Sequence, residues 1–188
     1  MEEMTLTETE ATELDKLELV PFTDPKLREV PQDFDFEKED AKELKDKLIT
    51  AMRELGGVGL SANQVGIDRK CFVIGDEGDF TKAFFNMEII GASKEEESLK
   101  EGCLSFPGLW LMVKRPKHCS IKYFNEEGEE IIETYQGVTA RVILHEYDHM
   151  LGANFTMRVS KMKLERAFKA LEKKVKKYQR QQANQSNL

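Results

Sequence analysis

The sequence predicts a single α+β domain, with antiparallel β-sheets around a central helix and a further helix at the C-terminus. Three observations predict this class. Short β-rich runs fill the middle of the chain, one helical pattern follows them, and no segment is repeated. A length of 188 residues suits one domain with its own core. A hydrophobic content of 40% is ordinary for a globular protein.

Three helices are predicted from apolar spacing and from end signals. Apolar side chains recur in steps of three and four over residues 37–55, and two glycines follow. A second helix is expected over residues 138–151, closed by Gly152. The third begins after Ser160, a good N-cap. Its apolar residues have the spacing that would dock it on the domain: Met162, Leu164, Phe168, Leu171, Val175 and Tyr178.

Four runs have the composition of β-strands, at residues 70–74, 83–90, 119–125 and 130–135. The last two are separated by Glu-Glu-Gly, which predicts a hairpin. The ends of the chain are predicted to be less ordered. Residues 1–18 are expected to be disordered or loosely attached, and residues 181–188 to form a disordered tail.

Composition favours a protein of the reducing cytoplasm. The first residues are acidic where a signal or transit peptide would be basic. No apolar run approaches the roughly 18–20 residues that span a bilayer, so no membrane partner is expected. The spacing of Cys71, Cys103 and Cys119 does not suggest a disulfide framework.

Charge is unevenly distributed along the chain. The net charge is −7, yet residues 161–180 carry nine Lys or Arg against two Glu, a local charge of +7 that leaves −14 elsewhere. This asymmetry favours contact between the third helix and an anionic partner. A solvated helix face is the alternative interpretation.

The sequence His145-Glu-Tyr-Asp-His149 in the second helix indicates a metal site. Histidines four residues apart share one helix face, so both imidazoles can reach one cation. Glu146 lies about 100° around the helix, where it can take a proton from metal-bound water. Two surface histidines that happen to be four apart are the alternative.

A catalytic metal usually has a third protein ligand. Cys103 is one candidate, in the short glycine-containing segment Glu-Gly-Cys-Leu-Ser. His118 is the only other histidine, and Glu165 and Glu172 lie downstream in the lysine-rich helix. The residues alone leave this choice open, since a lone cysteine is more often a small core residue.

Three motifs together resemble those of the peptide deformylases. They are Gly57-Val-Gly-Leu-Ser-Ala-Asn-Gln64, Glu101-Gly-Cys-Leu-Ser105 and His145-Glu-Tyr-Asp-His149, in the family's order. The resemblance covers residues 20–161, and it implies that residues 19–180 form one deformylase-like catalytic domain that includes the basic helix 160–180. The first motif departs from the family at Ser61, where alanine is more usual.

The resemblance implies an activity and roles for particular residues. The family removes the formyl group from the N-terminal formyl-methionine of new polypeptides. By similarity, Cys103, His145 and His149 would ligate the metal, with water in the fourth position, and Glu146 would be the general acid/base. The side-chain amide of Gln64 and the backbone N–H of Leu104 would stabilise the oxyanion. One divalent ion is implied, Fe²⁺ in the cell, with Zn²⁺, Ni²⁺ or Co²⁺ possible after purification.

Substrate contacts are also implied by the resemblance. Val58 resembles a position that lines the methionine pocket, and Gly59 would let an extended peptide approach. Val142 and Val138 share the metal-facing side of the second helix, and of the two Val138 is interpreted as a core residue. Trp110 stands where many bacterial relatives carry an arginine that meets the substrate backbone, so it would offer a flat apolar contact instead. By the same analogy, Asp148 would pair with Arg115 rather than bind the metal.

Two other functions remain open from the sequence. One is a His-Glu-x-x-His metallopeptidase with a downstream third ligand, and the other is a non-catalytic peptide-binding relative. The expected partners are N-formyl-methionyl nascent peptides, and the ribosome through the basic helix. No specific DNA partner is expected. The cytoplasm would be that of a bacterium, or of a host cell if the protein is phage-borne.

Overall fold

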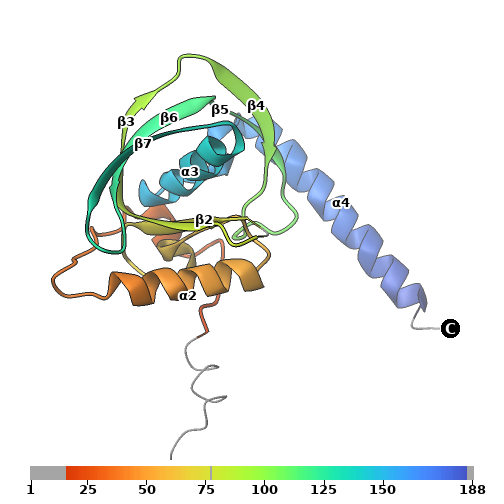
Figure 1. Cartoon of the computed structure of the whole chain (residues 1–188). Helices are drawn as coiled ribbons and strands as arrows, with labels where there is room; N and C mark the ends of the chain where they lie inside the picture. The colour runs from red at the N-terminus through yellow and green to blue at the C-terminus, as the bar shows by residue number, and fades with distance from the viewer. Residues whose placement is uncertain (1–15, 77, 186–188) are drawn as a thin grey trace, which may run out of the picture.

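The computed structural model describes residues 16–76 and 78–185, and it confirms the α+β class (Figure 1). Its helices are α2 (Ala41–Glu54), α3 (Gly137–Met150) and α4 (Lys161–Gln185), with short 3-10 helices η1 (Pro25–Arg28), η2 (Ala62–Val65) and η3 (Phe155–Arg158). Its strands are β1 (Gly59–Ser61), β2 (Cys71–Gly75), β3 (Thr81–Ala92), β4 (Glu96–Glu101), β5 (Leu111–Pro116), β6 (His118–Phe124) and β7 (Glu130–Gln136). In these two ranges, no helix combines the length and the apolar character that crossing a membrane requires.

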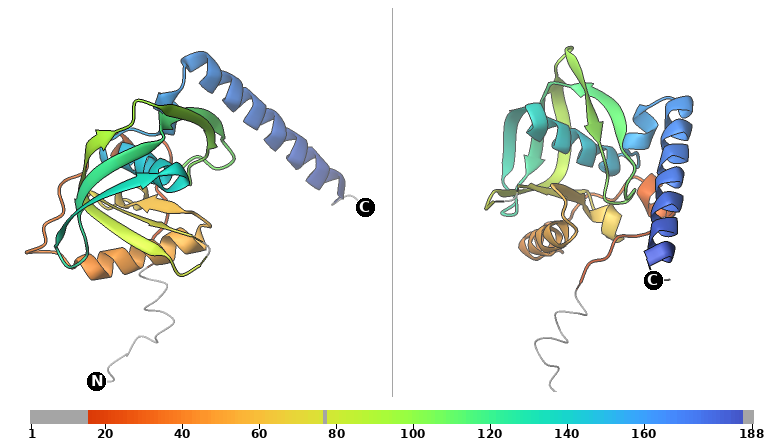
Figure 2. Two further views of the ribbon diagram at one scale, coloured as in Figure 1. Left: turned by 45° about the horizontal axis from the view of Figure 1, so that its top comes forward. Right: turned by 90° about the vertical axis from the view of Figure 1, so that its right-hand side faces the viewer.

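The strands form a curved five-stranded sheet and a separate two-stranded ribbon. The sheet order is β1-β2-β3-β6-β7 and the ribbon pairs β4 with β5, with every pairing antiparallel. Figures 1 and 2 show α3 inside the curve of the sheet and α2 on its outer side. The predicted hairpin is confirmed as the β6–β7 pair.

Strand β2 shows how the sequence builds a core on each face of the sheet. Successive side chains of a strand point to opposite faces. Cys71 and Val73 therefore pack with α2 in one core cluster, while Phe72 and Ile74 pack with α3 in the other. All four are buried, which explains why this strand reads as a continuous apolar run.

Helix α2 begins four residues later than the sequence predicts. The Asp40 carboxylate accepts hydrogen bonds from the backbone N–H groups of Lys42 and Glu43, so Asp40 is the N-cap and the helix starts at Ala41. Residues 37–39, Glu-Lys-Glu, form a turn and a bend instead, and the apolar spacing itself begins at Ala41. The predicted closure of α3 by Gly152 agrees with its positive φ of 64°, and a Cβ there would lie 2.7 Å from the carbonyl oxygen of Arg28.

Three strands were not predicted, namely β1, β4 and β5. β1 has only three residues, one of them glycine. β4 reads Glu-Glu-Ser-Leu-Lys-Glu, whose charged composition hides its pairing with β5. The alternation of buried and exposed residues in β5 follows the period of two expected of a half-buried strand.

Helix α4 departs from the sequence prediction in two ways. Its docking is confined to the first half, where Leu164, Ala167 and Leu171 pack beside β5 and η3. Met162, Phe168, Val175 and Tyr178 are exposed, and the distal half runs away from the body (Figures 1 and 2). The helical spacing was correctly interpreted, but Val175 and Tyr178 lie beyond Leu171, the last residue of α4 that packs against this core cluster.

Helix α4 extends past the predicted end of the domain. α4 continues to Gln185, so the boundary at residue 180 was wrong for residues 181–185, where Gln and Ala favour continuation of the helix. Residues 1–15 and 186–188 lie outside the described part of the chain, so the prediction of disorder there stays a prediction. Leu17 already packs against the first core cluster.

Candidate active site and metal centre

The two histidines of α3 meet Cys103, which lies just after β4. The ligand atoms of Cys103, His145 and His149 all lie within 4.8 Å of one another, and Cys103 Sγ is 3.5 Å from His149 Nε2. Over residues 16–76 and 78–185, this is the one cluster of three metal-binding side chains of this kind.

The other candidates for a third ligand lie elsewhere. His118 is exposed on β6, and Glu165 and Glu172 lie on α4, where Glu172 pairs with Lys176 instead. The structure therefore brings the upstream cysteine, rather than a downstream glutamate, to the histidines. A metallopeptidase arrangement with a ligand from the C-terminal helix does not fit this geometry.

The two histidines have contrasting electrostatic surroundings. Burial alone would lower the pKa of His145, but hydrogen bonds with Cys103 and Glu101 raise it to about 10. Burial, together with the charge of His145, lowers the pKa of His149 to about 3, so its imidazole stays neutral. The negative groups that stabilise a proton on His145 would equally stabilise a divalent cation among the three ligand atoms. A cysteine and two imidazoles are suitable donors for such a cation, so the site fits a metal.

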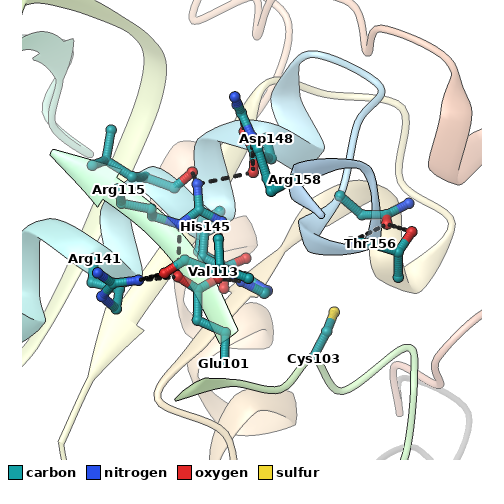
Figure 3. Close-up of polar contacts among 12 residues, drawn as sticks. Glu101, Cys103, Val113, Arg115, Arg141, His145, Asp148, Thr156 and Arg158 are labelled. Carbon is teal, nitrogen blue, oxygen red and sulfur yellow. Dashed lines mark hydrogen bonds and ion pairs between the residues drawn. The ribbon is translucent and has the colours of Figure 1, made fainter. Parts of the chain in front are cut away.

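The buried carboxylate of Glu101 contacts the Nδ1 side of the His145 ring and fixes its orientation (Figure 3). Glu101 Oε2 lies 3.1 Å from His145 Nδ1, which leaves Nε2 for the metal. Arg115 donates two hydrogen bonds to the same carboxylate and Arg141 a third, at 2.7–2.9 Å. Burial would raise the pKa of Glu101, but its partners, chiefly His145 and Arg115, lower it to about 2, so the group is a carboxylate.

Asp148 is not one of the three clustered ligands. Its pairing with Arg115 is confirmed, with Arg115 Nη1 3.0 Å from Asp148 Oδ2. Arg158 also binds both oxygens of Asp148. Figure 3 shows Arg115 between Asp148 and Glu101, joining the helix to the β4–β5 ribbon.

Glu146 is buried beside the cluster, with its two oxygens in different surroundings. The hydroxyl of Ser61 donates to Oε2 over 2.5 Å. Oε1 lies against Gly59, where a Cβ would be only 2.5 Å away. Burial raises the pKa of Glu146 above its ordinary value, although His145 and Ser61 act in the opposite direction.

Gln64 is held by hydrogen bonds at both ends of its amide. Its Oε1 accepts from the backbone N–H of Ser61 over 3.0 Å. Its Nε2 donates to Ser105 Oγ at 2.9 Å and approaches Cys103 Sγ at 3.4 Å. The amide nitrogen therefore points to the cysteine of the cluster. Leu104 follows Cys103, with its side chain against Gly57.

A pocket of about 650 Å³ opens at this cluster. All the residues predicted to contact substrate line it: Val58, Gly59, Trp110 and Val142. Val138 lines it too and is 70% exposed, so its interpretation as a core residue was wrong. It occupies the first turn of α3, which projects past the sheet's apolar interior. Trp110 is 55% exposed, with Lys100 Nζ 5.0 Å from the centre of its ring.

Sequence reasoning missed several residues that support the site. Arg141 and Arg158 were not singled out, and Asn63, Glu101 and Ser105 appeared only as letters of the motifs. Asn63 donates to the backbone carbonyl of His149 over 2.9 Å. The one available signal was that Glu101 and Ser105 flank Cys103 in a short motif, which marks them as neighbours of a ligand.

A cysteine and two histidines around one point, with a buried glutamate at the mouth of a pocket, define the class of metallohydrolases with a His-Glu-x-x-His helix. Comparison with known proteins narrows the class. Residues 16–165 match the sequence model of the Polypeptide deformylase family. The peptide deformylase of Thermotoga maritima is 39% identical over 142 residues, which cover 76% of this chain and 86% of the relative.

Solved structures agree with the sequence comparison. The crystal structure of the Thermotoga maritima enzyme superposes with a TM-score of 0.73 at 38% identity, covering 77% of this chain and 97% of that one. A peptide deformylase from Synechococcus elongatus, in complex with actinonin, gives 0.77 at 30% identity, covering 83% and 86%. A Met-Ala-Ser-bound peptide deformylase from Acinetobacter baumannii gives 0.72 at 26% identity, covering 76% and 98%. The chain belongs to the polypeptide deformylase family, whose enzymes are metal-dependent and act on formylated new polypeptides.

Proposed function

We propose that this chain removes the formyl group from N-formyl-methionyl polypeptides, using a divalent cation held by Cys103, His145 and His149. The observation that carries the proposal is the position of the Glu146 carboxylate, buried at the pocket beside the three ligand atoms. The relative from Acinetobacter baumannii was crystallised with Met-Ala-Ser, a peptide that begins with methionine. Such a peptide is what deformylation of formyl-Met-Ala-Ser would leave.

The reaction adds water to the formyl carbon and breaks the bond to the methionine nitrogen, giving formate and a free amine. A divalent cation at the three ligands supplies Lewis acidity, which makes water nucleophilic near neutral pH. Glu146 accepts the proton from the water and passes one to the leaving amine. Burial raises its pKa above the ordinary value, which favours holding the proton until it is passed on.

The formyl oxygen gains negative charge as the carbon becomes tetrahedral. Gln64 Nε2 points to the cysteine of the cluster and is a suitable donor to that oxygen, together with the backbone N–H of Leu104. Gln64 is held on both sides before substrate arrives, so little reorganisation is required. Removal of one such donor typically lowers the rate by about 100-fold or more.

The pocket suits an unbranched apolar side chain next to the reacting group. Val58 and Val142 provide apolar wall, and Gly59 gives the substrate backbone room to approach. Trp110 lies further out, with its ring over Gly102. We assign it a flat contact to the substrate beyond the first residue, in place of an arginine.

Ferrous iron is the metal we propose for the cell, with zinc, nickel or cobalt able to replace it in purified protein. The ligand set admits all four ions. A thiolate beside ferrous iron is open to oxidation, so the iron form should lose activity in air. Equal activity after long aerobic and anaerobic storage would contradict the assignment of iron.

Release of formate from formyl-Met-Ala-Ser tests the proposal. Protein loaded anaerobically with iron or nickel should release formate, and chelator-treated protein should not. The same preparation should leave unformylated Met-Ala-Ser intact. Cleavage of that peptide bond without formate release would favour a peptidase, and metal binding with neither reaction would favour a peptide-binding relative.

The metal affinity of the Cys103→Ala variant distinguishes a deformylase from a peptidase independently of activity. If Cys103 is a ligand, the variant should bind metal much more weakly than wild type in a chelator competition. Unchanged metal affinity would move the third ligand elsewhere.

We further propose that the distal half of α4 contacts ribosomal RNA, so that the enzyme works in the cytoplasm near emerging chains. Five cationic side chains of this half are exposed: Lys173, Lys174, Lys176, Lys177 and Arg180. Contacts of lysine with phosphate are independent of sequence and sensitive to salt. Deletion of residues 173–188 spares the docked half, and it should abolish salt-sensitive co-sedimentation with ribosomes. Unchanged co-sedimentation would exclude this role.

A further inference from the structure

The catalytic carboxylate of Glu146 is held asymmetrically. Over residues 16–76 and 78–185, Ser61 is the only residue whose side chain hydrogen-bonds it, through Oε2 at 2.5 Å. The other oxygen, Oε1, lies against Gly59, a residue of the pocket lining. One oxygen is therefore fixed from within the protein, and the other is directed to the side from which substrate and water arrive.

Ser61 is well placed to fix this orientation, because it is itself immobilised. It ends β1, is fully buried, and pairs with Phe72 of β2. Its backbone N–H donates to Gln64 Oε1 over 3.0 Å. One residue thus contacts both the proposed general acid/base and the proposed oxyanion donor, through its hydroxyl and its backbone respectively.

We propose that Ser61 is a positioning residue for deformylation: its hydroxyl selects the rotamer of Glu146 in which Oε1 faces the pocket. This inference rests on the proposed function. A hydrogen bond to a charged group in a buried site is strong enough to select one of two rotamers. Without the hydroxyl, the carboxylate loses the one side chain that hydrogen-bonds it in the described residues, so it can take other rotamers and fewer molecules hold Oε1 ready for the proton.

The Ser61→Ala variant tests this role, and Cys119→Ala is a matched control. Cys119 is equally buried, loses one side-chain heteroatom, and lies in β6 outside the pocket lining. We expect Ser61→Ala to lower kcat for formyl-Met-Ala-Ser about tenfold. KM and the affinity for nickel in a chelator competition should stay within about twofold of wild type. Cys119→Ala should keep the wild-type kcat.

A crystal structure of Ser61→Ala gives a readout that is independent of activity. We expect the Glu146 carboxylate to leave its place against Gly59, or to occupy two rotamers. An unchanged single rotamer overturns the proposal, as does a kcat within twofold of wild type or a parallel loss of nickel affinity. If the wild-type protein releases no formate, the proposed function fails. The Glu146 rotamer in the Ser61→Ala structure then still shows whether Ser61 positions Glu146.

Discussion

At the scale of single residues, the site depends on a close approach between strand β1 and helix α3. Gly59 lies so near Glu146 and Val142 that a Cβ would be 2.5 Å from Glu146 Oε1 and 3.0 Å from Val142 Cγ1. The sequence suggests glycine here for the approach of a peptide. The structure adds that the protein's own carboxylate already fills the space that a side chain would take.

Gly59→Ala should therefore inactivate the enzyme without unfolding it. The new methyl group must displace Glu146, and a shift of about 1 Å can cost about 100-fold in rate. Gly91→Ala is the control, because its Cβ would meet Ser120 at an ordinary 3.7 Å. Formate release and circular dichroism of both variants check this expectation. Wild-type rates in Gly59→Ala would show that the position of Glu146 does not limit the reaction.

The sequence predicts that the two histidines share one face because their spacing is local, whereas Cys103 was reached only through the family resemblance. His145 and His149 share a helix face by periodicity alone. The supporting network could not be predicted in this way, because Glu101, Arg115 and Arg141 come from three separate elements. Only the fold brings them together, and family analogy had predicted only the pairing of Arg115 with Asp148.

At the scale of elements, ion pairs and hydrogen bonds tie the edge strand β7 to its neighbours. Glu133 of β7 accepts hydrogen bonds from Lys82 of β3 at 2.6 Å and from the hydroxyls of Tyr123 and Tyr135. Burial by itself would raise the pKa of Glu133, but these donors lower it below its ordinary value of 4.5. The pair links strands β3 and β7 across β6.

The lowered pKa of Glu133 predicts how stability depends on pH. The folded protein binds this proton less readily than the unfolded chain, so the stabilisation is complete above the ordinary pKa of 4.5 and is lost as pH falls below it, through the lowered pKa of the folded state. Glu133→Gln should lower Tm at neutral pH, and its difference from wild type should shrink in acid. Glu130→Gln, on the same strand, is the control. A difference from wild type that stays constant over this pH range would contradict the prediction.

Elements were predictable where apolar periodicity dominates. The α3 pattern and the β6–β7 hairpin have strong local signals. The β4–β5 ribbon does not, since β4 is charged and is stabilised by Arg141 reaching the Glu97 carbonyl from α3. Strand β4 of this ribbon ends at Glu101, two residues before Cys103. The element that was hardest to predict therefore positions Cys103, a residue that the sequence motif made easy to single out.

At the scale of the whole molecule, the chain divides into a packed body and a projecting helix (Figure 1). The apolar residues of α4 predict that the entire helix docks. In the structure, the docked part ends near Leu171, whose side chain lies beside Gly108. Periodicity tells which face of a helix is apolar, but it does not tell how far the partner surface extends.

The melting temperatures of two truncated proteins should show that the docked half of α4 stabilises the fold and that the distal half does not. Removal of residues 173–188 takes away no side chain of the third core cluster, and residues 173–182 are exposed, so Tm should change by no more than about 2 °C. Removal of residues 160–188 also takes Leu164, Ala167 and Leu171 from the third core cluster, and should lower Tm by about 5 °C or more. Equal Tm values for the two truncations would contradict the division.

The most direct test of the proposed chemistry is formate release by Glu146→Gln loaded with the same metal as wild type. The substitution keeps size and shape but cannot carry the proton. We expect unchanged metal stoichiometry and a rate lower by about 100-fold or more. Formate release at the wild-type rate, with metal bound, would contradict the assignment of Glu146 as the group that moves the proton.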